Sequence, residues 1–144
     1  MNVFQNDYES RLKEWHNLKE SLVDLDIQSK CVIVDSWWQK APIVTHYLHT
    51  HDISNWPDPW ELLVENNYCY IARALGMCYT LYMTNAKDVE MVIATDQMGN
   101  DVVLVLVDNA KYILNYWPDT VLNNCLQDFT IKKTLDLAVL LQKL

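Results

Sequence analysis

The chain has 144 residues, of which 51% are hydrophobic, and a formal net charge of -8. This length predicts a single domain over residues 1–144, and the apolar share is enough to fill a core, which excludes a disordered chain. The negative charge argues against a nucleic-acid-binding protein, because phosphate contacts need clustered lysine and arginine.

The sequence carries no signal of a membrane or secreted protein. No apolar run reaches the length of a membrane span, and residues 1–6 lack the basic and apolar regions of a signal peptide. The four cysteines, Cys31, Cys69, Cys78 and Cys125, are widely spaced among apolar neighbours. This pattern is typical of reduced, buried thiols, and we expect the protein in the cytoplasm.

Two helices are predicted at the start of the chain. In the first, over residues 7–25, large apolar side chains recur every three or four residues: Tyr8, Leu12, Trp15, Leu18, Leu22 and Leu25. The second is predicted over residues 27–40, before Ala41 and Pro42. Residues 42–55 are expected to form an irregular connector.

The segment 55–63 fixes the start of a third helix. Asp58 is a good N-cap, Pro59 suits the first helical position, and Glu61 has the spacing of a capping box. This helix should run to about residue 66. A second segment, from residue 68 to about residue 83, is predicted as a buried central helix, with Gly76 either inside it or capping it.

Three β-rich runs follow, at residues 89–94, 102–107 and 111–116, and turn residues separate them. They predict an antiparallel meander. Residues 130–144 have apolar side chains at helical spacing and predict a closing helix. The expected fold is α+β, with helices at both ends and a central buried helix packed on a small three-stranded antiparallel meander.

The two glycines, Gly76 and Gly99, are too few for a phosphate loop, a dinucleotide fingerprint or a nucleophile elbow. We therefore expect no cofactor. A metal site is an alternative to a plain surface loop at the one cluster of ligand-type residues. On a strand or a helical turn, two of its histidines would share a face, and the cluster comprises His46, His49, His51 and Asp52.

Cysteine catalysis is a second alternative. Cys69 lies near a helix start, where the helix dipole can lower a thiol pKa. Its general base would be an upstream histidine, because none follows residue 51, and the candidates are His16, His46, His49 and His51. The competing interpretation is that Cys69 is a core residue.

A long helix followed by an antiparallel meander is similar to the core of the transglutaminase-like and papain-like folds. This resemblance implies a cysteine at the helix start, a histidine on a later strand, and then Asp or Asn. Here Asp58 to Glu61 stands at the helix start, residues 102–107 contain no histidine, and only Asp108 matches the last member. The resemblance therefore implies an inert relative used for binding.

A second resemblance rests on Asp35-Ser36-Trp37-Trp38 and on the run from Trp56 to Leu63, Trp-Pro-Asp-Pro-Trp-Glu-Leu-Leu. Over residues 35–83 the chain resembles small uncharacterised proteins of T4-like tailed phages. The resemblance implies a virion component, an assembly factor, or a protein that binds and inhibits a host factor. It would act in the cytoplasm of the infected cell or in the virion.

We expect a non-catalytic protein that acts through protein contacts, either with a virion or host protein or as a homo-oligomer, and without nucleic acid or membrane. The rival is a cysteine-dependent hydrolase or acyl transferase that uses Cys69 with His49 or His51. Residues 49–110 contain nine carboxylates and only two basic residues, Arg73 and Lys87. This excess of negative charge would suit a basic partner as well as solubility. Aromatic side chains that reach the surface are the candidate contacts: Trp37, Trp38, Trp56, Trp60, Tyr82 and Trp117.

Overall fold

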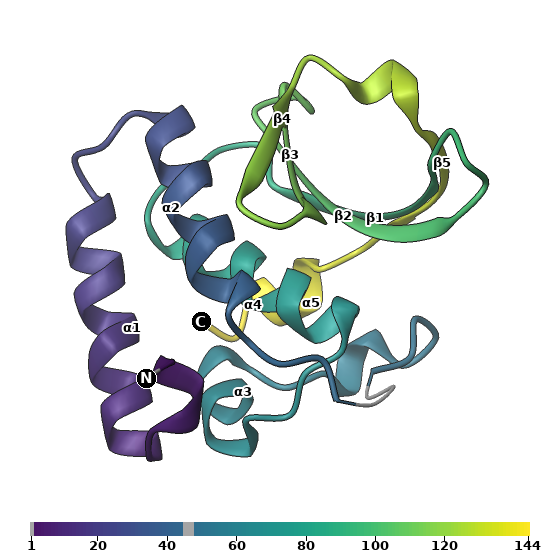
Figure 1. Cartoon of the computed structure of the whole chain (residues 1–144). Coiled ribbons are helices and arrows are strands. Elements are labelled where there is room, and N and C mark those ends of the chain that lie inside the picture. Colours follow the sequence, from purple (N-terminus) through teal and green to yellow (C-terminus); the bar gives the residue numbers. More distant parts are fainter. Residues whose placement is uncertain (1, 45–47) are drawn as a thin grey trace.

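The computed structural model describes residues 2–44 and 48–144 and has the predicted α+β architecture (Figure 1). Its helices are α1 (Tyr8–Leu22), α2 (Ile27–Gln39), α3 (Pro59–Glu65), α4 (Tyr70–Met83) and α5 (Ala138–Leu141). Its strands are β1 (Glu90–Thr95), β2 (Asp101–Val107), β3 (Tyr112–Trp117), β4 (Thr120–Asn123) and β5 (Thr130–Leu135). Short 3₁₀ turns occur at Val3–Gln5, Ile53–Asn55 and Leu126–Asp128.

Local chemistry explains where α3 begins and ends. The Glu61 N–H donates to the Asp58 carboxylate at 2.8 Å, and the Asp58 N–H donates to the Glu61 side chain at 3.3 Å. Pro59 occupies the first turn, so the predicted capping box is confirmed. The helix ends at Asn66, which adopts the left-handed conformation with φ of 51°. This turn separates α3 from α4.

Helix α4 is the predicted buried central helix. Every residue from Ile71 to Leu81 is buried, and α4 packs on α2, α3 and the strands β1, β2 and β3. Gly76 lies inside α4, where an added Cβ would stand 2.6 Å from the Trp38 ring of α2. Glycine is therefore needed because α2 approaches α4 too closely for any side chain.

A buried hydroxyl joins three helices beside Gly76. Thr80 of α4 accepts a hydrogen bond from the Trp15 indole N–H of α1 at 2.9 Å. It accepts a second from the Trp38 indole N–H of α2 at 3.0 Å. The hydroxyl in turn donates to the Gly76 carbonyl at 2.8 Å. Both tryptophans can therefore be fully buried with their polar atoms satisfied.

The sheet is antiparallel, and its strand order is β4-β3-β2-β1-β5. The predicted meander forms its centre as β1, β2 and β3. The closing helix predicted over residues 130–144 is wrong, because residues 130–135 are strand β5 and helix is limited to Ala138–Leu141. The threonines and Ile131 favour a strand, and the free edge of β1 supplies the partner, with a bulge between Ile93 and Ala94.

The sheet has a buried cluster on each face. One face packs on the helices. The other carries a smaller apolar cluster of Val92, Ala94, Leu104, Leu106 and Ile113. Because β4 and β5 form opposite edges, the chain between them must cross the sheet, and Figure 1 shows it arching over the curved strands. Leu126 and Phe129 of this crossing segment cover the second cluster.

Among the described residues, no helix has both the length and the apolar character that crossing a membrane requires.

Candidate functional site

The candidate site lies where α4 begins. Cys69 is the N-cap of α4, with extended backbone, and its Sγ accepts a hydrogen bond from the Ala72 N–H at 3.4 Å. The side chain is only 4% exposed. The sequence had placed Asp58 to Glu61 at the start of the long helix. The structure corrects this, because Asp58 caps α3 and Cys69 caps the central helix.

Two strand residues meet the start of α4. Asn115 on β3 has a φ of 68°, so its backbone leaves the regular strand conformation. Its side-chain amide donates to the Tyr70 carbonyl at 3.2 Å and to the Val103 carbonyl at 3.0 Å. Val103 on β2 packs on the helix-facing core, whereas its neighbour Val102 packs on the opposite cluster. Asn115 therefore joins β3 to β2 at Val103 and to the start of α4 at Tyr70, the residue that follows Cys69.

This arrangement bears on Asp108, the residue that the sequence matched to the Asp or Asn of the transglutaminase-like and papain-like folds. Asp108 had been the sequence candidate, but it lies in the β2–β3 turn, where its N–H donates to the Lys87 carbonyl at 3.3 Å. That turn is at the opposite end of the strands from the start of α4. Asn115 and Val103, by contrast, lie beside the start of α4, where the Asn115 amide bonds the Tyr70 and Val103 carbonyls.

A polar network lies behind Asn115. The Asn115 N–H donates to Asp35 of α2 at 2.9 Å, and the Gln39 side chain donates to the same carboxylate oxygen at 3.3 Å. Arg73 of α4 donates to the Gln39 side chain at 3.0 Å and to the Ala41 carbonyl at 2.5 Å. These bonds tie α2, α4 and β3 together under the site.

The network is buried and only partly satisfied. Asp35 is 1% exposed and Asn115 is 6% exposed, and each has a side-chain oxygen without a hydrogen-bond partner. Burial raises the pKa of Asp35, although the hydrogen bond from the Asn115 N–H opposes the rise. Burial also lowers the pKa of Arg73, although the negative charge of Asp35 opposes this change. The network therefore fixes the positions of its members at a cost in desolvation.

A hollow of about 270 Å³ opens over this network. It is lined by Tyr70, Asp101, Val102, Val103, Asn115 and Tyr116. These residues present two aromatic rings, an amide and a carboxylate, but no histidine stands among them. Such a lining can hold a ligand by apolar contact and charge, whereas it offers a thiol no imidazole to take its proton.

The histidines occupy other places. His16 lies on α1 beside Trp15, with ring centroids 5.8 Å apart. The rings of His49 and His51 stack at 5.6 Å, and His49 lines a separate hollow of about 220 Å³ with Asp52. Cys69 is not among the residues that line that hollow. The proposed pairing of Cys69 with His49 or His51 thus has no support in this geometry.

The predicted metal site is only partly visible. Its member His46 lies outside the described residues. Among the described residues, no group of three or more His, Cys, Asp or Glu side chains is arranged to hold a metal ion. His49, His51 and Asp52 do not form such a group by themselves, and the complete site of four stays a prediction.

The predicted contact aromatics divide by exposure. Trp38 and Trp56 are core residues at 1% and 4% exposure, and we remove them from the set of surface contacts. Trp37 and Trp60 are half-buried, the first against Phe4 and the second against Trp15. Trp117 is 62% exposed and Tyr82 is 46% exposed, so both are available to a partner.

Sequence reasoning missed the polar residues of the site. The signal for Asn115 is present but weak, since it is a lone polar residue within the run Tyr-Ile-Leu-Asn-Tyr-Trp. Asp35 and Arg73 stand among apolar residues of two helices, and nothing local indicates that they approach the same strand. All four cysteines are free, as expected, with Cys125 the most exposed.

A scan of protein-family models and a search of curated proteins found no match. Among solved structures, the chain is similar to calcium-bound LapG of Legionella pneumophila, with a TM-score of 0.74 and 16% identity over 91% of this chain and 77% of that one. A second structure of Legionella pneumophila LapG has a TM-score of 0.72 and 16% identity, over 92% of this chain and 76% of that one. EGTA-treated LapG of the same organism has a TM-score of 0.72 and 16% identity, over 91% of this chain and 75% of that one. At this identity the likeness shows that the fold is shared.

Proposed function

We propose that this protein acts by binding another protein and that it performs no cysteine-dependent hydrolysis. The observation that carries the proposal is Val103, which packs on the helix-facing side of β2 and lines the same hollow as Tyr70 at the start of α4, where the resemblance to transglutaminase-like cores calls for a strand histidine. A cysteine nucleophile needs an adjacent group to accept its proton, and valine cannot do so. The fold then serves as a rigid support for a contact surface.

Asn115 and Cys69 support the same conclusion. In a working triad the third member would orient the histidine. Here the Asn115 amide nitrogen donates to two main-chain carbonyls and so joins β3 to β2 and α4, while the amide oxygen accepts no hydrogen bond. Cys69 is almost fully buried, and its sulfur caps the helix by accepting from the Ala72 N–H. Both residues therefore have structural roles that need no substrate.

The rival function is a hydrolase or acyl transferase based on Cys69. It is favoured by one specific observation, which is that Cys69 stands at the start of the central helix, the position of the cysteine in transglutaminase-like cores. Under this alternative, a base would have to come from the histidines of the 46–51 segment. The experiment below separates the two functions.

The test is a tagged pull-down from the cells that naturally make the protein, run in parallel with wild type and Cys69→Ser. Serine keeps an oxygen that can cap α4, so the variant should fold. A binding protein captures the same intact partner in the same amount with both forms. Cleavage of the captured protein by wild type, with trapping of the intact protein by Cys69→Ser, would contradict the proposal and support the hydrolase.

The biological setting is proposed from the resemblance of residues 35–83 to proteins of T4-like tailed phages. In that setting the protein is a virion component or assembly factor, or it binds and inhibits a host factor. It would then be found in the cytoplasm of the infected cell or in the virion. Mass spectrometry of the captured partner tests this directly, because a virion protein and a host enzyme lead to different assignments.

A further inference from the structure

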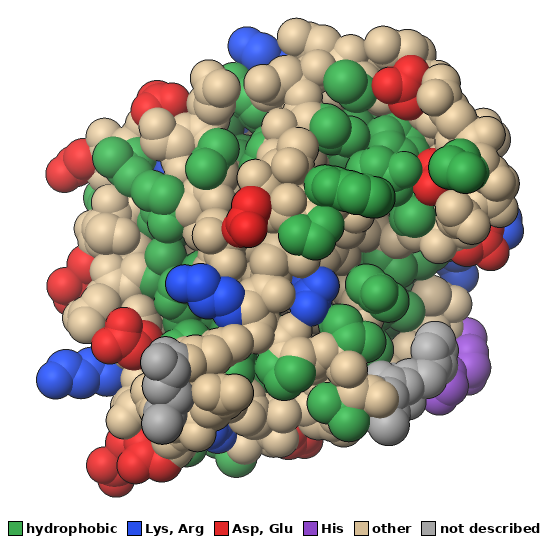
Figure 2. Space-filling model, in the orientation of Figure 1, with side chains coloured by type: hydrophobic (Ala, Val, Ile, Leu, Met, Phe, Trp, Pro, Cys, Tyr) green, Lys and Arg blue, Asp and Glu red, His purple; other side chains and the backbone are tan. Residues whose placement is uncertain are grey.

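One end of the sheet carries exposed apolar side chains from three separate segments. In an antiparallel meander, the β1–β2 and β3–β4 turns lie at the same end, and the bonds of Asn115 bring the start of α4 to it. The segments present Tyr70 at 59% exposure, Met98 at 87% and Trp117 at 62%. We call this region, together with the hollow lined by Tyr70 and Tyr116, the sheet-end surface. Figure 2 shows hydrophobic side chains gathered over the strands at the upper right, with acidic side chains beside them.

The sheet-end surface is held in place by its own contacts. The Tyr116 ring lies 5.0 Å from Phe129 and 6.3 Å from Trp117, between ring centroids. Its hydroxyl donates to Asp96 in the β1–β2 turn at 3.0 Å. The same carboxylate accepts the N–H groups of Met98 and Asn100 at 3.0 and 2.9 Å. Exposed side chains on such a fixed frame lose little freedom when a partner binds.

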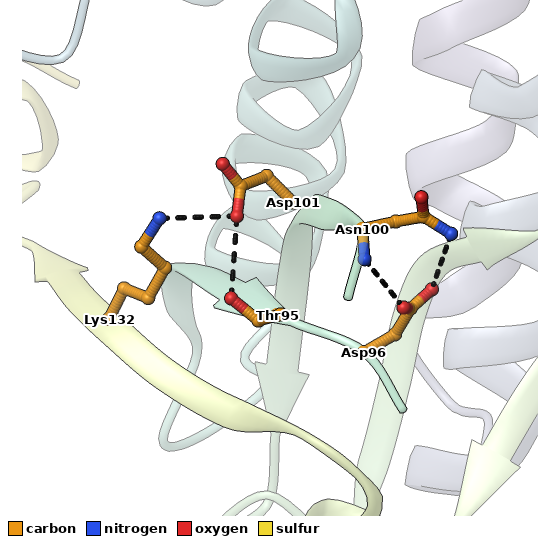
Figure 3. Close-up of polar contacts among 5 residues, drawn as sticks. All are labelled: Thr95, Asp96, Asn100, Asp101 and Lys132. Carbon is orange, nitrogen blue, oxygen red and sulfur yellow. Dashed lines mark hydrogen bonds and ion pairs between the residues drawn. The ribbon is translucent and has the colours of Figure 1, made fainter. Parts of the chain in front are cut away.

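The charge around these side chains is mainly negative, although Lys132 pairs with Asp101 and the Arg73 guanidinium lies 5.9 Å from the Tyr70 ring centroid. Residues 88–131 contain seven carboxylates, and their one basic residue, Lys111, belongs to the β2–β3 turn at the far end of the strands. The carboxylates of Asp96, Asp101, Asp119 and Asp128 belong to the near end, in the two turns, at the first residue of β2 and in the crossing segment. Figure 3 shows that Lys132 reaches Asp101, at 3.2 Å, while Asp96 binds only Asn100 among the residues drawn.

We infer that the sheet-end surface binds a lysine- or arginine-rich segment of the protein partner. This inference rests on the proposed function. The aliphatic stems of such side chains pack on Tyr70 and Trp117, and their cationic ends lie over the aromatic rings or beside the aspartates. The hollow over Asn115, at about 270 Å³, is large enough for one such side chain. A neutral or acidic segment would fit the shape but not the charge.

The experiment uses a library of random twelve-residue peptides, panned against the intact protein. We expect the enriched peptides to contain an excess of lysine and arginine. For the tightest peptide, made synthetically, Trp117→Ser and Tyr70→Ser should each weaken binding about tenfold or more, as for aromatic hot spots. Val64→Ser is the matched control, because Val64 on α3 is an apolar side chain of similar exposure, at 53%, and does not belong to the sheet-end surface.

Charge is tested separately. Asp101→Asn combined with Asp119→Asn should weaken the same peptide, and raising the salt from about 50 to about 300 mM should do so for wild type. Glu14→Gln on α1 is the control for a lost surface charge and should have no effect. Thermal melting of each variant confirms that it is folded.

Three results would overturn the inference: no enriched peptide, enriched peptides without a basic excess, or binding that tolerates the changes at Trp117 and Tyr70. Each leaves the proposed function standing if the pull-down still captures an intact partner. Cleavage of the partner in that pull-down would instead remove the proposed function itself.

Discussion

The hydroxyl of Thr80 offers the sharpest test of how the helices are held together. It is fully buried and is the acceptor for the indole N–H groups of Trp15 and Trp38. Valine has nearly the same shape but cannot accept, so Thr80→Val leaves two buried donors unsatisfied. Each such donor costs about 1–3 kcal/mol, and the two together should lower the free energy of unfolding by about 2–6 kcal/mol.

Thr80→Ser is the matched control. It keeps the hydroxyl and removes one methyl group, which should cost about 1 kcal/mol. Urea unfolding followed by tryptophan fluorescence and by circular dichroism gives both values on one scale. If Thr80→Val is as stable as Thr80→Ser or more stable, the shared hydrogen bonds do not contribute as described, and packing alone joins α1 and α2 to α4.

Two further predictions concern the same core. Gly76→Ala places a Cβ 2.6 Å from the Trp38 ring. We expect an overpacking cost of about 1–3 kcal/mol, which outweighs the gain of about 1 kcal/mol in helix propensity. Urea unfolding should therefore show a lower free energy of unfolding than wild type, and a more stable variant would contradict the close approach. Burial raises the folded pKa of Asp35 above its ordinary value of 3.8, so folding binds protons, and wild type should lose stability relative to Asp35→Asn as the pH rises from about 4. The difference should level off above the raised pKa, and a relative gain of wild type with rising pH would refute the burial argument.

Local chemistry made a large part of the fold predictable. The start of α3 follows from Asp58, Pro59 and Glu61, because a cap and a first turn depend on neighbours in the chain. The meander follows from alternating β-branched residues and turn residues. The run from Ile71 to Leu81 is apolar apart from Arg73 and Thr80, which is the property of a helix surrounded by protein.

What failed depends on residues far apart in the chain. Residues 130–135 are a strand because β1 has a free edge, and the spacing of Ile131 and Leu135 suits a helix equally well. Asn115 reaches the start of α4 only because its left-handed backbone turns the side chain out of the strand pattern. The central helix was predicted from residue 68, but the resemblance to transglutaminase-like cores was matched to Asp58 at the helix start, because the sequence does not show which of two successive helices carries the equivalent position.

The most direct test of the central claim is the rate at which each thiol reacts with iodoacetamide near neutral pH, resolved by mass spectrometry. Burial raises the pKa of Cys31 and of Cys78 to about 12, so both should react slowly. Cys125 is the most exposed thiol and sets the reference rate. The account predicts that Cys69 reacts more slowly than Cys125. A Cys69 that reacts much faster than Cys125 would show an activated nucleophile and would contradict a purely binding function.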